Sequence, residues 1–561
     1  LIGVGLSALE LIPEYQLTQL TSRGQGLGFL QSQECALGVF DFVRYLLPNF
    51  NFNVGCESLL YVGVLPLILA IIAIVYLRRD RRLIFWLSLL AFALLFSIKY
   101  SPLAWIFHQL PVWGSLRGPA RFIMLGNFAL AILTGFGFNW ILENKESFKE
   151  LKIFQWIKRV FFVFVSLIAA INILGLFQKI FIKLADNYFD KYYYSKTIGL
   201  PLEHYHGAIE NLISSNFYTF SFLNKDFLIP FILTSSAFLI FIFIRKFNKA
   251  TLFYAFLFCG FIWAITSPMV SSGLTRDFFK ETEVTKFLKN QDGTFRIYSL
   301  LPGLATYQLV ATLPDSNQND ENEFFKTMLP PNLNLVYDLD SIDGYESSIP
   351  RRTARLLSEL LSERANLGNK IAEARLKPEE KIKIFETRAN ILAMMNVKYI
   401  ISAYPLDEKI FKKVFENHAT RFKIPVYIYE NRNILPRFYV ANRVEFAAAD
   451  EIGSLEKMLV PDFDFKAATL IECEKSQDCS QTSGRGKITD SEYKDGYLKL
   501  KTEFNTPGWI VFSESFSPFW RAKVNNESVS IYKANYVYQA VKAPVGNNLV
   551  EFEYKPKFFE K

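Results

Sequence analysis

Histidine and cysteine are scarce in this chain, which has only 4 His and 5 Cys among its 561 residues. Cys473 and Cys479 are separated by five residues, but no His lies close to them in the sequence, so a mixed Cys and His zinc site is not predicted there. Cys35 and Cys56 share another segment. An even number of cysteines in each segment is what an oxidising compartment permits. We therefore expect the disulfides Cys35–Cys56 and Cys473–Cys479, with unpaired thiols as the alternative.

An initiating Met, a signal peptide and an internal repeat are all absent from the sequence. Leu1–Ile12 is apolar but too short for a membrane span, so we expect the chain to begin inside a helix. It would then be a fragment that lacks the N-terminal part of the protein and could lack a final span as well. The absence of a repeat disfavours a transporter, because many transporter folds consist of two related halves.

Long apolar runs, in contrast, are frequent before Val270, although the mean hydropathy of the whole chain is only +0.15. The runs that are long enough, or nearly so, to cross a hydrocarbon core of about 30 Å are Tyr61–Leu77, Leu83–Ile98, Ala120–Leu142, Val160–Phe177, Phe227–Ile244 and Thr251–Val270. With the truncated first segment, they predict a polytopic α-helical membrane domain of about seven spans in residues 1–270.

Lys and Arg are unevenly distributed among the loops between these runs. Residues 78–82, 143–159 and 245–249 hold 12 of them in 27 positions, whereas the alternate loops 13–60, 97–118 and 178–226 hold 9 in 119. Basic loops stay on the cytoplasmic side of a membrane, so this alternation predicts that the residues after 270 lie outside the cytoplasm. The formal net charge of +8 resides mostly in the cytoplasmic loops, and no nucleic-acid partner is predicted.

Beyond Val270 the pattern changes to short helices and strands. Thr294–Leu300 and Val397–Ser402 resemble strands and Arg351–Met395 is mainly helical in composition, so residues 271–460 predict a mixed α/β domain. Residues 480–561 consist of short runs with alternating apolar side chains between Pro, Gly and Asn turns, which predicts an antiparallel β-sandwich. Its aromatic residues could form a sugar-stacking face or simply fill the core and the sheet edges.

Several segments, in order along the chain, resemble the bacterial YfhO-type membrane protein family. They are LIPEYQLTQLTSRG (11–24), LRGPARFIMLGNFALAILTGFG (116–137), the Asp-Gly-Tyr segment 332–352, MNVKYIIS (395–402), LPRFYV (435–440) and GWIVFSESFSPFWRA (508–522) with the strands that follow it. The resemblance implies a place in the type C glycosyltransferase superfamily. Members of that superfamily are polytopic enzymes that take a sugar from a polyprenyl phosphate and transfer it outside the cytoplasm.

The same resemblance implies a location, partners and a reaction. We expect a multi-pass protein of the bacterial cytoplasmic (inner) membrane whose C-terminal soluble region is extracytoplasmic. Its expected partners are the lipid bilayer, a polyprenyl-phosphate sugar and a cell-envelope glycopolymer or glycolipid acceptor. Two other functions remain open: a non-catalytic envelope polymer assembly protein and a transporter of lipid-linked saccharides. An acidic residue just outside the first span would favour the enzyme.

Sugar transfer needs a carboxylate near the acceptor and cations near the departing phosphate. The resemblance implies that the main catalytic acid lies upstream of Leu1, so the catalytic residues are unknown. Glu10 and Glu14 are candidates because acids at membrane depth are costly and often functional. No metal-ligating residues and no certain cofactor are predicted; a divalent metal is possible but not indicated.

The candidate substrate-binding residues are four arginines. Arg117 and Arg121 flank Pro119 at the outer mouth of a span, where two cations suit a lipid phosphate, although both could instead be interfacial anchors. Arg23 and Arg44 are the only basic residues of loop 13–60. A local ion pair with Asp41 is the alternative for Arg44. We expect Arg117 and Arg121 to open toward a cleft that they share with Arg23 or Glu14.

Overall fold

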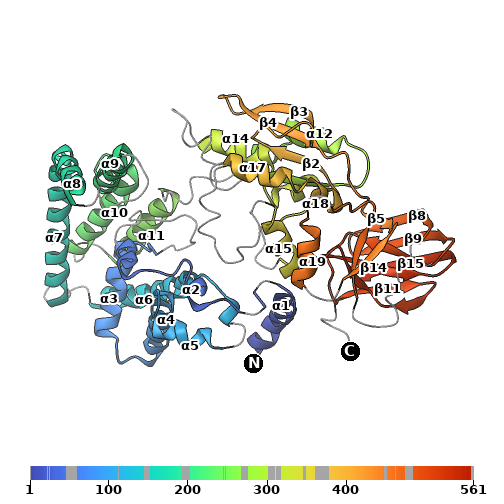
Figure 1. Cartoon of the computed structure of the whole chain (residues 1–561). Coiled ribbons are helices and arrows are strands. Elements are labelled where there is room, and N and C mark those ends of the chain that lie inside the picture. Colours follow the sequence, from blue (N-terminus) through green and yellow to red (C-terminus); the bar gives the residue numbers. More distant parts are fainter. Residues whose placement is uncertain are drawn as a thin grey trace. The chain divides into compact units, whose positions relative to one another are not determined.

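The computed structural model describes residues 2–21, 23–24, 26–45, 60–110, 113–144, 152–192, 202–243, 246, 248–266, 276–300, 310, 318–344, 349–360, 378–447, 451–460, 463–473 and 484–556. The chain forms two compact units (Figure 1). Unit 1 combines Leu1–Gln25 with Leu274–Lys561, and unit 2 is Gly26–Gly273. The first helix, α1 (Ile2–Gln19), thus belongs with the C-terminal part of the chain rather than with the apolar helices that follow it.

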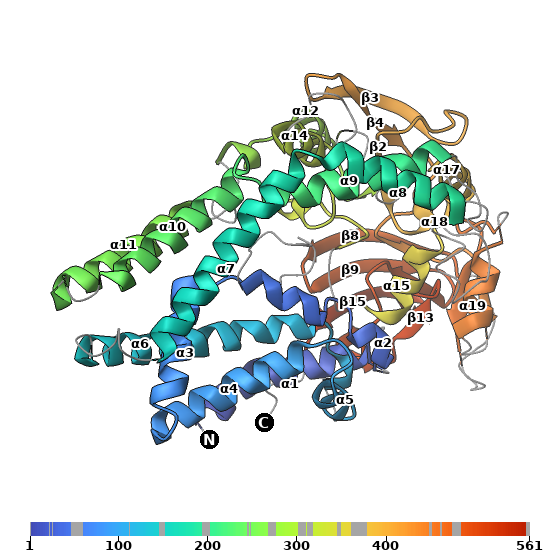
Figure 2. The ribbon, with the colours of Figure 1, turned by 90° about the vertical axis from the view of Figure 1, so that its left-hand side faces the viewer.

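The described part of unit 2 consists of helices. Its α-helices are α2 (Phe29–Ser32), α3 (Val64–Tyr76), α4 (Arg81–Ser97), α5 (Pro102–His108), α6 (Ile123–Asn144), α7 (Lys152–Gly175), α8 (Gln178–Tyr192), α9 (Leu202–Thr219), α10 (Lys225–Ile242) and α11 (Lys249–Thr266). Short 3₁₀ helices cover Val39–Tyr45, Trp113–Ser115 and Pro119–Phe122. Each apolar run expected to span the membrane therefore forms a helix, and α10 lies beside α11 (Figure 2).

Helices α3, α4 and α6 share a core that includes Leu83, Ile123 and Leu133. Gly137 of α6 lies so close to α3 that a Cβ atom at this position would be 1.9 Å from the carbonyl oxygen of Leu69. Small residues allow such close helix packing, which apolar helices in a membrane rely on.

Two helices of the described chain are long and apolar enough to cross a membrane, Pro119–Asn144 and Lys152–Gly175. Among the other apolar runs, α4 is as long as expected, with 17 residues, but α3 is shorter than Tyr61–Leu77. Helix α3 has 13 residues and begins at Val64, directly after Gly63, whose φ is 93°. At 1.5 Å per residue, such a helix is about 20 Å long and falls short of the hydrocarbon core. The polytopic arrangement therefore remains a prediction.

In unit 1, residues 276–460 form a four-stranded sheet with helices on both faces. The strands are β1 (Arg296–Leu300), β2 (Val397–Ser402), β3 (Lys412–Ala419) and β4 (Ile424–Glu430), in the order β1-β2-β4-β3. Strands β1 and β2 are parallel, and the other pairs are antiparallel. The helices are α12 (Glu283–Lys289), α14 (Gln318–Met328), α15 (Arg351–Ser358), α17 (Pro378–Glu386), α18 (Ala389–Met394) and α19 (Glu451–Met458), with 3₁₀ helices at Arg276–Phe279 and Leu333–Tyr337.

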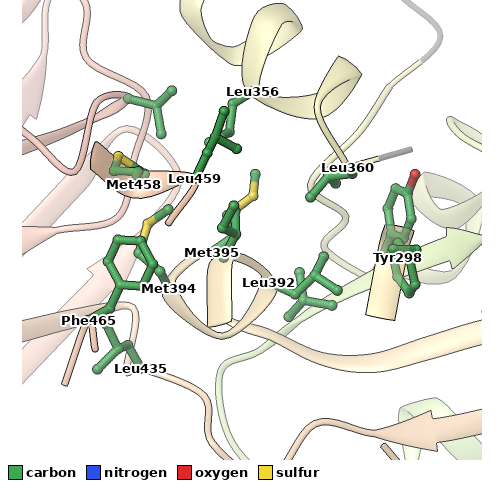
Figure 3. Packing of buried hydrophobic residues seen from close by; sticks show 14 of the residues in the cluster. Tyr298, Leu356, Leu360, Leu392, Met394, Met395, Leu435, Met458, Leu459 and Phe465 are labelled. Atoms are coloured by element: carbon green, nitrogen blue, oxygen red, sulfur yellow. The ribbon is translucent and has the colours of Figure 1, made fainter. Parts of the chain in front are cut away.

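Each face of this sheet has its own hydrophobic core, because alternate side chains of a strand point to opposite faces. Ile297 packs with helices α12 and α14, whereas its neighbour Tyr298 packs with α15, α17 and α18. In the core that contains Tyr298, the side chains of Leu356, Met395 and Leu459 lie close together (Figure 3). The mixed helix and sheet architecture expected for this region is present.

The C-terminal part is a β-sandwich, as predicted. One sheet has the order β5-β10-β14-β13-β7-β6 and the other β12-β11-β15-β9-β8. Their strands are β5 (Phe438–Val440), β6 (Val444–Ala447), β7 (Thr469–Glu472), β8 (Gly486–Lys494), β9 (Tyr497–Phe504), β10 (Gly508–Phe512), β11 (Trp520–Val524), β12 (Glu527–Val529), β13 (Tyr532–Ala534), β14 (Tyr538–Ala543) and β15 (Gly546–Tyr554). Phe504, Phe512 and Phe552 fill the core between the sheets.

The first sheet of the sandwich includes strands β5, β6 and β7, which lie within residues 438–472. These strands precede residue 480, where we expected the sandwich to begin. Strands β6 and β7 have only four residues each and are parallel to one another. The sandwich thus extends into the region expected to belong to the mixed α/β domain.

Candidate functional site

A cavity of about 500 Å³ lies in unit 1, where the end of α1, the start of α15 and the loop between β10 and β11 meet. Its lining residues are Leu17, Gln19, Leu20, Thr21, Pro350, Arg351, Arg352, Thr353, Ser515, Phe516, Ser517, Pro518, Trp520, Lys533, Val537 and Tyr554. We call it the main cavity. Its volume lies within the roughly 300–1,000 Å³ of sites that bind small molecules.

Backbone and hydroxyl contacts hold the three segments of the main cavity together. Thr21 forms an isolated antiparallel bridge with Pro350, and the amide of Arg351 donates to the carbonyl of Leu20 at 3.1 Å. The hydroxyls of Thr353 and Ser515 lie 3.2 Å apart. These contacts fix the end of α1 against the start of α15, and α15 against the sandwich.

Aromatic side chains form one wall of the cavity. Trp520 of β11 pairs across the sheet with Tyr554 of β15, with ring centroids 5.3 Å apart and planes at 67°. Trp520 also meets the buried Phe512 edge-on at 5.6 Å, so the core below fixes its ring. Both Trp520 and Tyr554 keep part of their surface exposed. Rings presented in this way offer flat apolar faces next to polar groups.

The main cavity is positively charged. Arg351, Arg352 and Lys533 line it, and none of the lining residues that the structure describes is a carboxylate. Arg352 donates to the buried Glu472 and to the carbonyl of Tyr536, and Lys533 lies 3.9 Å from Glu472. Arg351 pairs with Glu451 at 2.8 Å, so the three cations that line the cavity face two carboxylates, Glu451 and Glu472, and one positive charge remains in excess. The cavity also lies at the N-terminal end of α15, whose helix dipole adds partial positive charge.

The candidates Glu10, Glu14 and Arg23 lie in unit 1, close in sequence to the cavity but not among its lining residues. Glu10 and Glu14 are exposed on α1. This helix contributes Leu17 to the lining of the cavity, and Leu20 directly follows the helix. The backbone amide of Arg23 donates to the hydroxyl of the buried Thr21 at 3.2 Å. Along the chain, Glu10 and Glu14 thus precede the residues of this segment that line the cavity, and Arg23 follows them.

The candidates Arg44, Arg117 and Arg121 lie in unit 2. Arg44 is buried and forms the local ion pair with Asp41 that we considered as its alternative, at 2.6 Å. Arg117 is exposed and pairs with Glu34 at 3.1 Å. It lines a cavity of only about 40 Å³, which cannot admit a sugar phosphate. Arg121 is exposed near the start of the helix Pro119–Asn144, and its role at the outer mouth of a span stays a prediction.

We expected Arg117 and Arg121 to share a cleft with Arg23 or Glu14. This cleft stays a prediction, because Arg117 and Arg121 belong to unit 2, whereas Arg23 and Glu14 belong to unit 1. Within unit 2, Pro119–Phe122 is a 3₁₀ helix that precedes α6. Arg117 lies before Gly118, which is in the left-handed conformation, so Arg117 and Arg121 do not share a face of one regular α-helix.

Sequence reasoning did not single out the residues that line the main cavity. Arg351 and Arg352 were visible at the end of the Asp-Gly-Tyr segment, and Trp520 within GWIVFSESFSPFWRA. Each motif was recognised, but not the contact between them. That contact joins segments far apart in the chain, and no local pattern predicts it.

Cys35 and Cys473 are disulfide-bonded, whereas their expected partners, Cys56 and Cys479, lie outside the described residues. Without reduction, we expect the denatured protein to have one titratable thiol, that of Cys259, and five after reduction. Thiol titration with and without reductant measures both numbers. Three thiols without reduction would mean that Cys35 and Cys473 bond to each other and would contradict the expected pairing.

A family model described as bacterial membrane protein YfhO matches residues 1–449. The match includes two of the segments that line the main cavity, the end of α1 and the start of α15, whereas the loop between β10 and β11 lies beyond it. No curated protein and no solved structure matches the chain. Because the match covers most of the sequence, the chain belongs to the YfhO family of bacterial membrane proteins.

Proposed function

We propose that this protein is a membrane glycosyltransferase that moves a sugar from a polyprenyl phosphate to a cell-envelope acceptor outside the cytoplasm, and that the main cavity binds the saccharide acceptor. The composition of the cavity carries this proposal. Trp520 and Tyr554 supply apolar faces for sugar C–H groups, and Thr353, Ser515 and Ser517 supply hydroxyls for sugar hydroxyls.

In the proposed reaction, an acceptor hydroxyl oxygen forms a bond to the anomeric carbon of the donor sugar. The bond between that carbon and the phosphate oxygen breaks, and the phosphate leaves with the electron pair. A base takes the proton of the acceptor hydroxyl. Cations stabilise the charge of the departing polyprenyl phosphate. Arg121, at the start of the helix Pro119–Asn144, remains a candidate cation for that phosphate, whereas Arg117 already pairs with Glu34.

The base is not among the described residues that line the main cavity, because these include no carboxylate. Glu10 and Glu14 on α1 were the candidates from the sequence, and neither lines the cavity. The same observation favours a second function, that of a non-catalytic assembly protein that binds an envelope polymer in the main cavity. The two functions differ in one property: only the enzyme transfers sugar.

The proposal requires the main cavity to face the outside of the cytoplasmic membrane. A fusion of alkaline phosphatase after residue 300 should be active, because this enzyme needs the oxidising compartment outside the cytoplasm. The control is the same fusion after residue 80, within the basic loop expected to be cytoplasmic, which should be inactive. Activity at residue 80 and none at residue 300 would contradict the orientation.

A transfer assay tests the proposed reaction. The full-length protein is reconstituted in vesicles with radiolabelled polyprenyl-phosphate sugars and isolated bacterial envelope polymer, and label in the polymer is measured. We expect transfer from at least one of the common sugar donors, and none in vesicles without the protein. Binding of the polymer without transfer from any donor would favour the assembly protein instead.

A further inference from the structure

A second cavity, of about 340 Å³, adjoins the main cavity along the loop between β10 and β11. The two cavities share Phe516, Ser517, Pro518 and Trp520 in their walls. The other lining residues of this side cavity are Arg521, Ala522, Ser528, Val529 and Ile531. The two cavities are therefore neighbours along the segment Phe516–Trp520.

The side cavity repeats the chemistry of the main cavity on a smaller scale. Both contain the ring of Trp520, at least one serine hydroxyl and a cation, which is Arg521 in the side cavity. As in the main cavity, none of the lining residues described there is a carboxylate. Two neighbouring sites with the same kinds of groups suit a ligand whose chemical unit repeats.

We infer that the two cavities are adjacent subsites for a saccharide chain of two or more residues that carries negative charge, with Trp520 between the subsites. The inference rests on the proposed function, because it specifies the acceptor that the main cavity would bind. A chain gains a second set of contacts at little further cost in lost freedom once its first residue is bound. A single neutral sugar would use neither the side cavity nor the cations.

The cations that the chain would meet are already positioned by the fold. Lys533 lies over the ring of Phe516, with its Nζ atom 5.3 Å from the ring centroid, and near the buried Glu472. Arg521 is exposed on β11 next to Trp520. Each cavity is thus lined by a different cation, Lys533 in the main cavity and Arg521 in the side cavity, so that anionic groups of successive residues of one chain could each meet a cation.

Binding of defined oligomers tests the inference without need for turnover. Galacturonic acid and its α-1,4-linked dimer and tetramer provide anionic chains of increasing length, and maltotetraose provides a neutral chain. Binding to the full protein in detergent is measured by the change in tryptophan fluorescence at low and high salt. A tetramer of glutamic acid tests whether an acidic peptide binds instead.

We expect the anionic tetramer to bind at least about tenfold more tightly than the monomer and the neutral tetramer, with an advantage that high salt reduces. Arg521→Ala should weaken tetramer binding by about tenfold and leave monomer binding unchanged, whereas Lys533→Gln should weaken both. Lys523→Ala is the matched control. It removes a cation from the same strand that lines neither cavity, and should change nothing.

Equal affinity for monomer and tetramer, no effect of Arg521→Ala, absence of binding by all the saccharides, or preference for the peptide would each overturn the inference. Failure of the proposed function has a different signature. If the function alone is wrong, length-dependent binding persists without sugar transfer. If the inference alone is wrong, transfer occurs but does not depend on acceptor length or on Arg521.

Discussion

Replacing Arg437 with Ala should lower the free energy of unfolding by about 3–5 kcal/mol, because it breaks a buried network of charged groups. Arg437 is 6% exposed and donates to Glu514, Asp340 and the hydroxyl of Tyr493. Burial alone would lower the pKa of Arg437, but the charges of Glu514 and Asp340 outweigh burial and hold the pKa above its ordinary value. The guanidinium therefore stays charged, and its removal takes this partner from Asp340 and leaves Glu514 with Arg296 as its cation.

The network joins the mixed α/β part of unit 1 to the sandwich, because Glu514 also accepts from Arg296 of β1 at 2.7 Å. Thermal unfolding of the full protein in detergent measures the effect. Arg443→Ala is the matched control, since Arg443 is 64% exposed and pairs only locally with Glu445. Such an exposed pair contributes at most about 1 kcal/mol. Equal melting temperatures for the two variants would contradict the role given to the network.

Replacing Trp520 with Ala should reduce transfer, measured as kcat/KM for the acceptor, by about 10- to 100-fold, mostly through a higher KM. The reason is that Trp520 lines both cavities. Trp520→Phe keeps an aromatic face and should recover much of the loss. A reduced kcat with an unchanged KM would place the effect on chemistry instead of on acceptor binding.

Phe519→Ala is the matched control for Trp520→Ala. Phe519 precedes Trp520 in the chain and contacts the same Tyr554, with ring centroids 6.1 Å apart, but it lines neither cavity. We expect this variant to transfer sugar as the unmodified protein does. Equal losses in the two variants, or a matching loss of thermal stability in Trp520→Ala, would mean that Trp520 acts by supporting the sandwich.

The sequence predicts the elements of this fold better than their limits and contacts. The apolar runs all form helices, because side-chain periodicity and composition are local properties. Helix α3 is shorter than its apolar run, since it begins only after Gly63, whose positive φ lies outside the helical region. Strand β7 was not predicted at all. It has four residues and is completed by its pairing with β13, which is distant in sequence.

The same distinction applies to the candidate site. The pairing of Arg44 with Asp41 was anticipated because the residues are three apart, and the structure contains it. The Arg437 network and the main cavity were not anticipated. Both depend on which surfaces of separate segments meet, as when Thr353 reaches Ser515. A motif gives the identity of such residues, but only the tertiary fold gives their neighbours.

Photo-crosslinking from the wall shared by the two cavities tests the central claim most directly. Ser517, which lines both cavities, is replaced by the photoreactive residue p-benzoylphenylalanine, and the full protein is irradiated in membranes with labelled envelope saccharide. The proposed function predicts saccharide attached at position 517, and none when the photoreactive residue replaces Lys487, an exposed residue of β8 that lines neither cavity. Equal labelling at the two positions, or none at 517, would contradict saccharide binding in the main cavity.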